Sequence, residues 1–300
     1  MIFLAVLKPF SSLFLALLFL PSVAVAVSAI QLTDSSGHTL VLKSAAHRVI
    51  SLAPNLTELL YSIGAGDHLV AVSEYSDYPP AAKKLPRIGG AASVDIERIV
   101  AMKPDLVLTW KTGTPEATQE YLRQLKLPVF ELEFQNTEEI AGGMEILGEL
   151  TGQEVRAGAA SHKFKKRLNV LRQQYEQRAS VTVFYQVWDR PLMTLNRRHF
   201  INDLIKLCGG RNVFADLPSL VSAVDIESVI GRAPEAIIAA SGRKHKQQWL
   251  EQWSSWKTIP AVKNNNIFFI KPDLLSRPGP RILQGATILC RDLQSVRQAR

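Results

Sequence analysis

Aromatic and arginine residues stand where the sequence predicts loops at strand ends. An aromatic ring with a polar tip offers a broad apolar face to a flat organic ligand. A guanidinium in a proline-rich turn can bind phosphate, carboxylate or amide oxygens with little loss of entropy. These residue types favour recognition of a large, flat ligand with polar edges. The residues are Tyr75, Tyr78, Trp110, Trp188, Arg277 and Arg281.

A structural interpretation of the same residues stays open. Aromatic rings also pack inside protein cores, and arginines near a helix start pair with local acids or are solvated. Residue type alone therefore indicates a candidate cleft, and the elements that carry these side chains decide between the two interpretations.

Catalytic patterns are weak in this sequence. The six histidines show no HxxE, HxxxH or Cys/His grouping, so a zinc site is not expected. No GxSxG, P-loop or strand-associated GxGxxG motif is present. We therefore expect a binding protein and not an enzyme, with no metal site and no cofactor of its own.

The two cysteines, Cys208 and Cys290, are expected to form a disulfide. They are the whole cysteine content of a chain that an apolar leader would send to an oxidising compartment. The alternative is a catalytic thiol, but neither cysteine has a sequence-local histidine or a CxxC partner.

The first 29 residues resemble a secretory signal peptide. Residues 1–29 are almost wholly apolar, with Lys8 as the single charge and small residues at the end. Cleavage after Ala26 or after Ala29 fits the pattern, and no cysteine at the junction could carry a lipid. The alternative is an uncleaved anchor, because the apolar run is long enough to span a bilayer. We expect an exported, periplasmic protein.

The positive charge does not predict a nucleic-acid partner. The formal net charge is +8, but the basic residues are scattered and match no nucleic-acid-reading motif. We interpret most of them as solvated helix faces.

Strand and helix patterns alternate on both sides of one long amphipathic segment. Such alternation predicts α/β architecture with mainly parallel sheets, whose carboxyl ends face the ligand. The segment from Glu154 to Arg178 is long enough to connect two lobes, although a covering helix of a single domain is the alternative. We expect lobes at residues 30–152 and 180–300, with residues 153–179 connecting them.

An internal repeat supports two lobes of similar fold. Val-Asp-Ile-Glu occurs at residues 94–97 and again at residues 224–227, each time followed by a proline and a buried strand. Both copies have an aspartate at the helix start, where it can cap free N–H groups.

Five segments between residues 47 and 290 resemble the periplasmic cobalamin-binding proteins of ABC importers. The strand–helix and Lys-Pro-Asp segments mark a broader class that also takes iron-siderophores and haem. The Tyr-Ser-Asp-Tyr-Pro-Pro loop and the cysteine pair narrow the resemblance to cobalamin. The segments are His47-Arg-Val-Ile-Ser-Leu-Ala-Pro, Tyr75-Ser-Asp-Tyr-Pro-Pro, Glu97-Arg-Ile-Val-Ala-Met-Lys-Pro-Asp, Cys208-Gly-Gly-Arg-Asn-Val-Phe and Pro280-Arg-Ile-Leu.

This resemblance implies a fold, a ligand and contact residues. It implies two lobes held rigidly by one backbone helix, with cobalamin in the cleft as a transported ligand. Among the family's ligand contacts, Ala53, Tyr75, Trp110 and Arg277 are the matching positions, and Trp188 lies near a second-lobe aromatic.

The resemblance also implies a partner. Glu97 and Glu227 match surface acids, one per lobe, that pair with arginines of the dimeric ABC permease. The protein itself is expected to be a monomer. The alternative role of both acids is to stabilise a helix N-terminus.

This chain departs from the family at two places. Tryptophans of some members align with Gly89–Ala92 and lie near Ser219–Val221, where this chain has small or aliphatic residues. We expect a wider cleft or different contacts there. An iron-siderophore or haem in the same fold is therefore the alternative ligand, and an enzyme or sensor domain on this scaffold is a more distant alternative.

Overall fold

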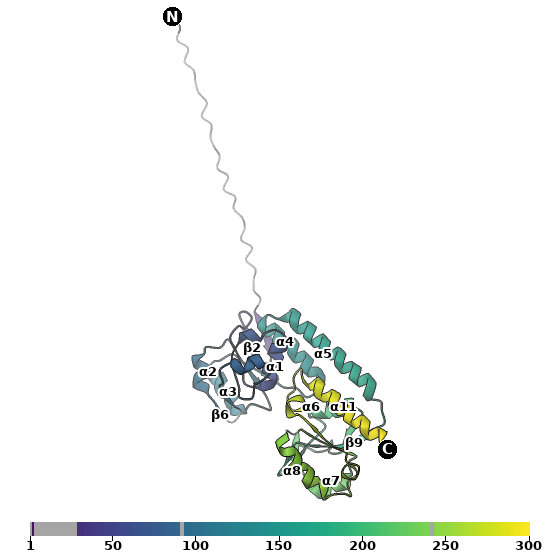
Figure 1. Cartoon of the computed structure of the whole chain (residues 1–300). Helices are drawn as coiled ribbons and strands as arrows, with labels where there is room; N and C mark the ends of the chain where they lie inside the picture. Colours follow the sequence, from purple (N-terminus) through teal and green to yellow (C-terminus); the bar gives the residue numbers. More distant parts are fainter. Residues whose placement is uncertain (1, 3–28, 91–92, 241–242) are drawn as a thin grey trace.

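The chain forms two α/β lobes joined by one long helix (Figure 1). The computed structural model describes residues 2, 29–90, 93–240 and 243–300. The predicted signal peptide, apart from two residues, lies outside these ranges. Within them, no helix is both long and apolar enough to cross a membrane.

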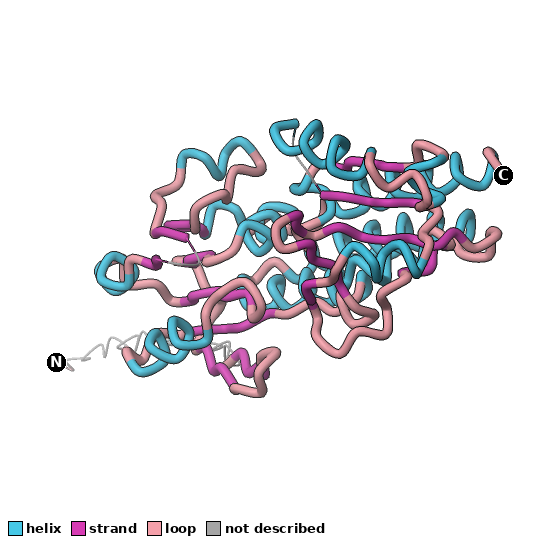
Figure 2. Tube along the Cα trace, turned by 90° about the horizontal axis from the view of Figure 1, so that it is seen from below, coloured by secondary structure: helices cyan, strands magenta, loops and turns pink. Residues whose placement is uncertain are grey.

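Each lobe is built on a four-stranded parallel sheet, and the two sheets have the same strand order. The N-terminal sheet runs β4-β3-β7-β8, and the C-terminal sheet runs β12-β9-β14-β15. Figure 2 shows the strands of both sheets among their covering helices. The bounds are β3 Val49–Ser51, β4 Leu69–Val72, β7 Leu106–Trp110, β8 Val129–Leu132, β9 Val181–Gln186, β12 Gly210–Asn212, β14 Ala236–Ala240 and β15 Ile267–Ile270.

Short antiparallel pairs and helices complete the lobes. The remaining strands are β1 Ile30–Thr33 with β2 Thr39–Leu42, β5 Gly89–Gly90 with β6 Ser93–Val94, and the group β10 Trp188–Asp189, β11 Leu192–Leu195 and β13 Val221–Ala223. The helices are α1 Pro54–Ser62, η1 Gly66–His68, η2 Pro80–Lys84, α2 Ile96–Ala101, α3 Glu116–Gln124, α4 Thr137–Thr151, α5 Glu154–Tyr175, α6 Phe200–Leu207, α7 Ile226–Arg232, α8 Arg243–Ser254, α9 Pro260–Lys263, α10 Pro272–Leu275 and α11 Ile282–Gln298.

The repeated Val-Asp-Ile-Glu segment forms the same unit in both lobes. Asp95 and Asp225 cap α2 and α7, each accepting the backbone N–H three residues later. Each helix leads through a proline into β7 or β14. Just before these strands, Asp105 accepts the backbone N–H groups of the two residues that precede β3, and Glu235 accepts the N–H of Thr182 in β9. The sequence repeat is therefore a structural repeat.

The long helix α5 runs alongside α4 and α11 and so reaches both lobes (Figure 1). It buries Ala157, Phe164, Leu168 and Leu171 and leaves its basic residues outside. Gly152 takes φ 66°, the left-handed conformation that ends α4 and turns the chain into α5.

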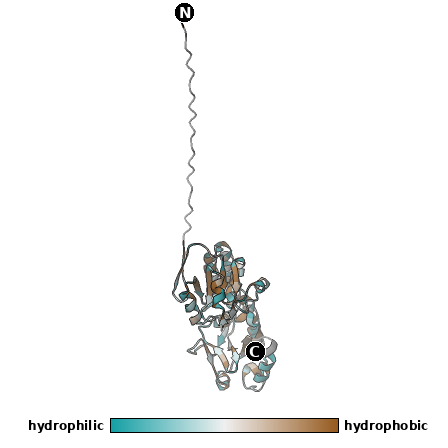
Figure 3. Ribbon diagram, turned by 90° about the vertical axis from the view of Figure 1, so that its left-hand side faces the viewer, coloured by the Kyte–Doolittle hydropathy of each residue, from teal (hydrophilic) through white to brown (hydrophobic). Residues whose placement is uncertain are grey.

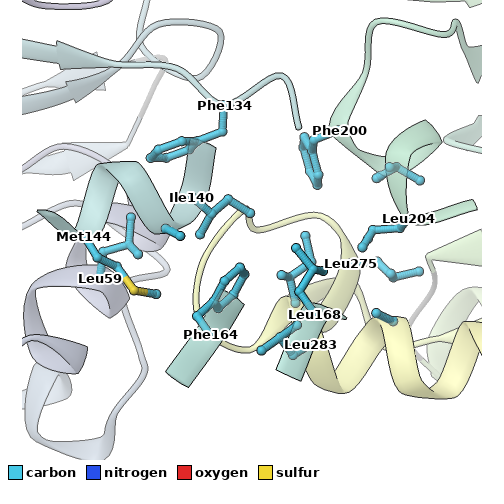
Figure 4. Close-up of a cluster of buried hydrophobic side chains, with 14 of the residues drawn as sticks. Leu59, Phe134, Ile140, Met144, Phe164, Leu168, Phe200, Leu204, Leu275 and Leu283 are labelled. Atoms are coloured by element: carbon cyan, nitrogen blue, oxygen red, sulfur yellow. The ribbon is translucent and has the colours of Figure 1, made fainter. Parts of the chain in front are cut away.

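One apolar cluster continues from lobe to lobe. Figure 4 shows its members from α1, α4, α5, α6, α10 and α11 packed together. Two smaller clusters cover the opposite faces of the two sheets, and Figure 3 shows the most hydrophobic segments inside the lobes. Because interiors pack densely and resist deformation, the shared cluster holds the lobes at a fixed separation. The labelled members are Leu59, Phe134, Ile140, Met144, Phe164, Leu168, Phe200, Leu204, Leu275 and Leu283.

The expected disulfide is present in the structure. Cys208, at the end of α6, is bonded to Cys290 in α11, and their Cα atoms are 4.6 Å apart. The bond ties the C-terminal helix to the body of the second lobe.

A buried ion pair joins the lobes beside the apolar cluster. Arg281 donates from Nε and Nη2 to the two carboxylate oxygens of Glu58, at 2.8 and 2.6 Å. The Glu58 side chain is 1% exposed and that of Arg281 is 14% exposed. The hydrogen bond to Glu58 raises the pKa of Arg281, although burial alone would lower it.

Replacing Glu58 by glutamine is expected to destabilise the protein. The substitution removes the carboxylate that binds the buried Arg281 guanidinium through two hydrogen bonds, which costs about 3 kcal/mol or more. Glu145→Gln is the matched control, because its pair with Lys165 is about half-exposed and contributes roughly 0.5 kcal/mol. Urea unfolding measures both changes; equal effects of the two variants would contradict the prediction.

Candidate ligand-binding site between the lobes

A cavity of about 960 Å³ lies between the two lobes. The N-terminal lobe contributes the carboxyl ends of β7 and β8 and one face of α4, and the C-terminal lobe contributes the start of α6 and of β13. In open parallel sheets, ligands bind at the carboxyl ends of the strands. The lining residues are Ser35, Trp110, Lys111, Thr112, Leu132, Glu133, Phe134, Gln135, Glu139, Gly142, Gly143, Ile146, Arg198, His199, Phe200, Leu220 and Val221.

Of the five predicted ligand contacts, Trp110 is the one that lines this cavity. Its indole Nε1 donates to Glu133 Oε1 at 3.1 Å. The backbone of Gly113 packs against the ring so closely that a Cβ there would lie 2.2 Å from the indole. Both contacts hold the ring in one orientation, which suits it to stack on a flat ligand.

His199 borders the cavity from the second lobe. Its Nδ1 accepts the N–H of Ile201 at 3.2 Å and so caps α6. Its ring lies 4.6 Å from that of Phe200, centroid to centroid. Burial lowers the pKa of His199 to about 4, so the imidazole is neutral at pH 7.

Ala53, Tyr75 and Trp188 are not among the residues that line the cavity. Ala53 is buried at the N-cap of α1. Tyr75 follows β4 with φ 63° and is 76% exposed. Trp188 is half-exposed in β10 of the second lobe. The two exposed rings lie at strand ends, as the sequence indicates.

Arg277 binds carboxylates of the protein. Its Nη1 donates to Asp77 at 2.9 Å and to Glu58 at 3.3 Å, and its Nη2 lies 3.0 Å from Asp273. Burial raises the pKa of Asp77, but the hydrogen bond and the charge of Arg277 outweigh it and the pKa is lowered. The nearby Arg281 guanidinium also stacks on Tyr78, 4.1 Å from the ring centroid. This turn therefore joins the two lobes, and both arginines form ion pairs with carboxylates of the protein.

The two predicted docking acids occupy equivalent positions. Glu97 and Glu227 are exposed in the first turns of α2 and α7. No hydrogen bond or ion pair is formed by either carboxylate within the part of the chain that the structure describes.

One of the two places without tryptophan lines the cavity. Gly89 and Gly90 form β5, and residues 91–92 of the same loop are outside the described residues. Leu220 and Val221 line the cavity directly. Aliphatic side chains therefore form the cavity wall at this second place.

The structure also bears on metal binding. In residues 29–90, 93–240 and 243–300, no group of three or more histidine, cysteine or acidic side chains is arranged to hold a metal ion.

Comparison with known proteins identifies the family. The model of a family described as periplasmic binding protein matches residues 49–274. The chain belongs to the periplasmic binding protein family. A vitamin B12-binding protein of Vibrio cholerae is 37% identical to this family member over 246 residues, which are 82% of this chain and 88% of the relative.

Solved structures agree with this assignment. The crystal structure of the periplasmic vitamin B12-binding protein BtuF of Vibrio cholerae matches with a TM-score of 0.78 and 36% identity, covering 84% of this chain and 98% of that one. A possible iron-binding, periplasmic solute-binding protein of Staphylococcus epidermidis matches with a TM-score of 0.74 and 29% identity, covering 83% and 99%. The predicted resemblance is confirmed.

Sequence reasoning missed part of the cavity of this periplasmic binding protein. Phe134, Phe200 and the α4 residues Gly142 and Gly143 were not among the predicted strand-end loops. One signal was available: two adjacent glycines inside a helix destabilise it and usually mark a packing or binding requirement.

The stability of the protein is expected to fall at acidic pH because of His199. Its pKa is about 4 in the folded protein against 6.5 ordinarily. Keeping this ring neutral contributes at most about 3 kcal/mol to the free energy of unfolding. The contribution is complete above pH 6.5 and is lost as the pH falls towards 4. His199→Asn keeps a capping oxygen and removes the titration, so its unfolding free energy should vary less across this range. His162→Asn, at an exposed position, is the control; a pH profile of His199→Asn that matches the wild type would contradict the prediction.

Proposed function

We propose that this protein captures cobalamin between its two lobes and delivers it to the permease of an ABC importer, acting as a binding protein and not as an enzyme. The observation that carries the proposal is the aromatic-walled cavity that both lobes line. Its volume is in the range of small-molecule sites. The ligand named for the Vibrio cholerae relatives supports cobalamin in particular.

We assign ligand contacts to residues around the cleft. Trp110 stacks on the ligand from the first lobe, with Ala53 and Tyr75 nearby, and Trp188 contributes from the second lobe. Arg277 binds an amide or phosphate oxygen of the ligand. That oxygen takes the place of Asp77, while Glu58 and Asp273 keep the guanidinium positioned.

We also propose a periplasmic location for the protein and limits for its lobes. Residues 1–29 are a signal peptide, cleaved after Ala26 or Ala29, and the mature monomer acts in the periplasm. The lobes comprise residues 30–152 and 180–300, and residues 153–179 connect them.

Glu97 and Glu227 are the proposed anchors on the permease. A binding protein with two similar lobes that meets a twofold permease needs equivalent anchors, one on each lobe. Exposed charges suit this role, because they set orientation and encounter rate more than affinity.

Calorimetric titration with cyanocobalamin tests ligand binding. The mature protein should bind one molecule per chain. Trp110→Ala should weaken binding about tenfold through the lost stacking surface. Haemin and a ferric siderophore are titrated in parallel. If either of these binds with measurable heat and micromolar cyanocobalamin does not, the ligand of this protein is an iron chelate and not cobalamin.

Uptake into vesicles that contain the permease and its ATPase tests docking. Glu97→Arg combined with Glu227→Arg should abolish uptake and leave the affinity for the ligand unchanged, because the acids lie outside the cleft. Glu116→Arg with Glu154→Arg makes the same charge change at two other helix starts and should preserve uptake. Unimpaired uptake by the first pair of substitutions would refute the assigned role.

A further inference from the structure

The outer face of α5 is positively charged. Residues 155–175 of this helix include six lysines and arginines and no aspartate or glutamate. Lys163, Lys166, Arg167 and Val170 are spaced three, one and three residues apart, so they lie on one side of the helix. All four are exposed, and the residues that α5 buries in the apolar cluster lie on the other side. The solvent side of α5 therefore presents basic side chains and no acid of its own.

Acids of the neighbouring helix α4 compensate the edge of this face. Glu138 binds Arg172, and Glu145 accepts from Lys165 at 2.8 Å. The hydrogen bond from Lys165 lowers the pKa of Glu145, so this carboxylate is ionised at pH 7. A third acid, Glu139, lines the cavity between the lobes. These pairs neutralise two of the six basic residues.

Four basic residues of α5 keep their charge without a paired acid. Arg156, Lys163, Lys166 and Arg167 form no ion pair within the part of the chain that the structure describes. All four are exposed. The remaining acid of α4, Glu149, offsets at most one of these four charges. This surface is therefore positive even when the acids around it are counted.

Apolar side chains are exposed on the same side of α5. Val155 is 88% exposed and Val170 is 53% exposed. Steps of three and four residues lead from Val155 through Lys166 to Val170, so both valines lie beside the basic side chains. A helix face that combines basic and apolar residues is typical of binding to a membrane surface. An anionic bilayer offers phosphate groups to the basic side chains and an interfacial region to the valines.

The shape of this face favours a lipid surface over an acidic protein. The 22 residues of α5 extend for about 33 Å along one edge of the molecule (Figure 1). No α5 residue lines the cavity between the lobes or the smaller apolar cavity that α8 borders. A convex helix with unpaired, flexible side chains offers no fixed geometry to one particular protein. A bilayer presents many equivalent phosphate groups in a plane, which such a helix can bind.

We propose that α5 is a contact surface for anionic phospholipid and concentrates the protein at a membrane. The proposal does not depend on which ligand the cleft binds. Glu97 and Glu227 lie on α2 and α7, at other edges of the molecule (Figure 1), so lipid bound to α5 leaves them uncovered. Each basic residue near an anionic surface strengthens binding roughly fivefold, and salt screens this attraction.

Sedimentation with lipid vesicles tests the proposal. The mature protein, without its apolar leader, should bind vesicles that contain phosphatidylglycerol, and should bind vesicles of phosphatidylcholine alone about tenfold more weakly. Lys163→Gln combined with Lys166→Gln and Arg167→Gln should weaken binding to the anionic vesicles about tenfold or more, because three charges are lost. Glutamine is a good helix former, so the free energy of unfolding in urea should stay close to that of the wild type.

A matched variant separates the face of α5 from the net charge of the protein. Lys83→Gln combined with Lys84→Gln and Lys263→Gln also removes three exposed positive charges and should change vesicle binding less than about twofold. Equal losses in the two triple variants, or a wild-type protein that does not bind the anionic vesicles, would overturn the proposal. Immobilised polyglutamate is measured in parallel. Binding to polyglutamate without binding to the vesicles would assign the face to an acidic protein instead.

Discussion

Burial of apolar surface across the boundary between the lobes is the constraint on which the rest of the structure depends. Side chains of α4, α5, α6 and α11 share one cluster, so the two sheets cannot change their separation without exposing it to water. The Glu58–Arg281 pair adds a directional contact at the edge of this cluster. The space between the strand ends is consequently set by the packing of the folded protein.

A cavity of fixed shape affects the free energy of ligand binding. A ligand in this space meets the Trp110 ring already oriented, so little side-chain entropy is lost on binding. The indole of Trp110 is held by Glu133 and Gly113, and Arg277 is held by three carboxylates. Selectivity then depends on which side chains the cavity wall has or lacks.

The parts of the structure that follow local rules were predictable from sequence. Strands and helices of both lobes, their parallel order and the structural equivalence of the two Val-Asp-Ile-Glu segments follow from periodicity and capping. Trp110 was predictable because it ends a buried strand. The partners of Arg277 and Arg281 were not, since Glu58 is more than two hundred positions away in the chain. The part of the cavity wall that α4 forms could not be predicted, because its glycines face a cavity only when α6 lies opposite. The strands β10, β11 and β13 could not be predicted either, because their sequences lack strong strand signals.

The position of α11 has a consequence for how the protein matures. This last helix contributes Leu283 to the shared cluster, Cys290 to the disulfide and, just before it, Arg281 to Glu58. A chain is synthesised from its N-terminus, so the first lobe emerges long before the segment that clamps it to the second. The shared cluster, the disulfide and the ion pair with Glu58 are therefore completed only after residues 281–298 have been synthesised.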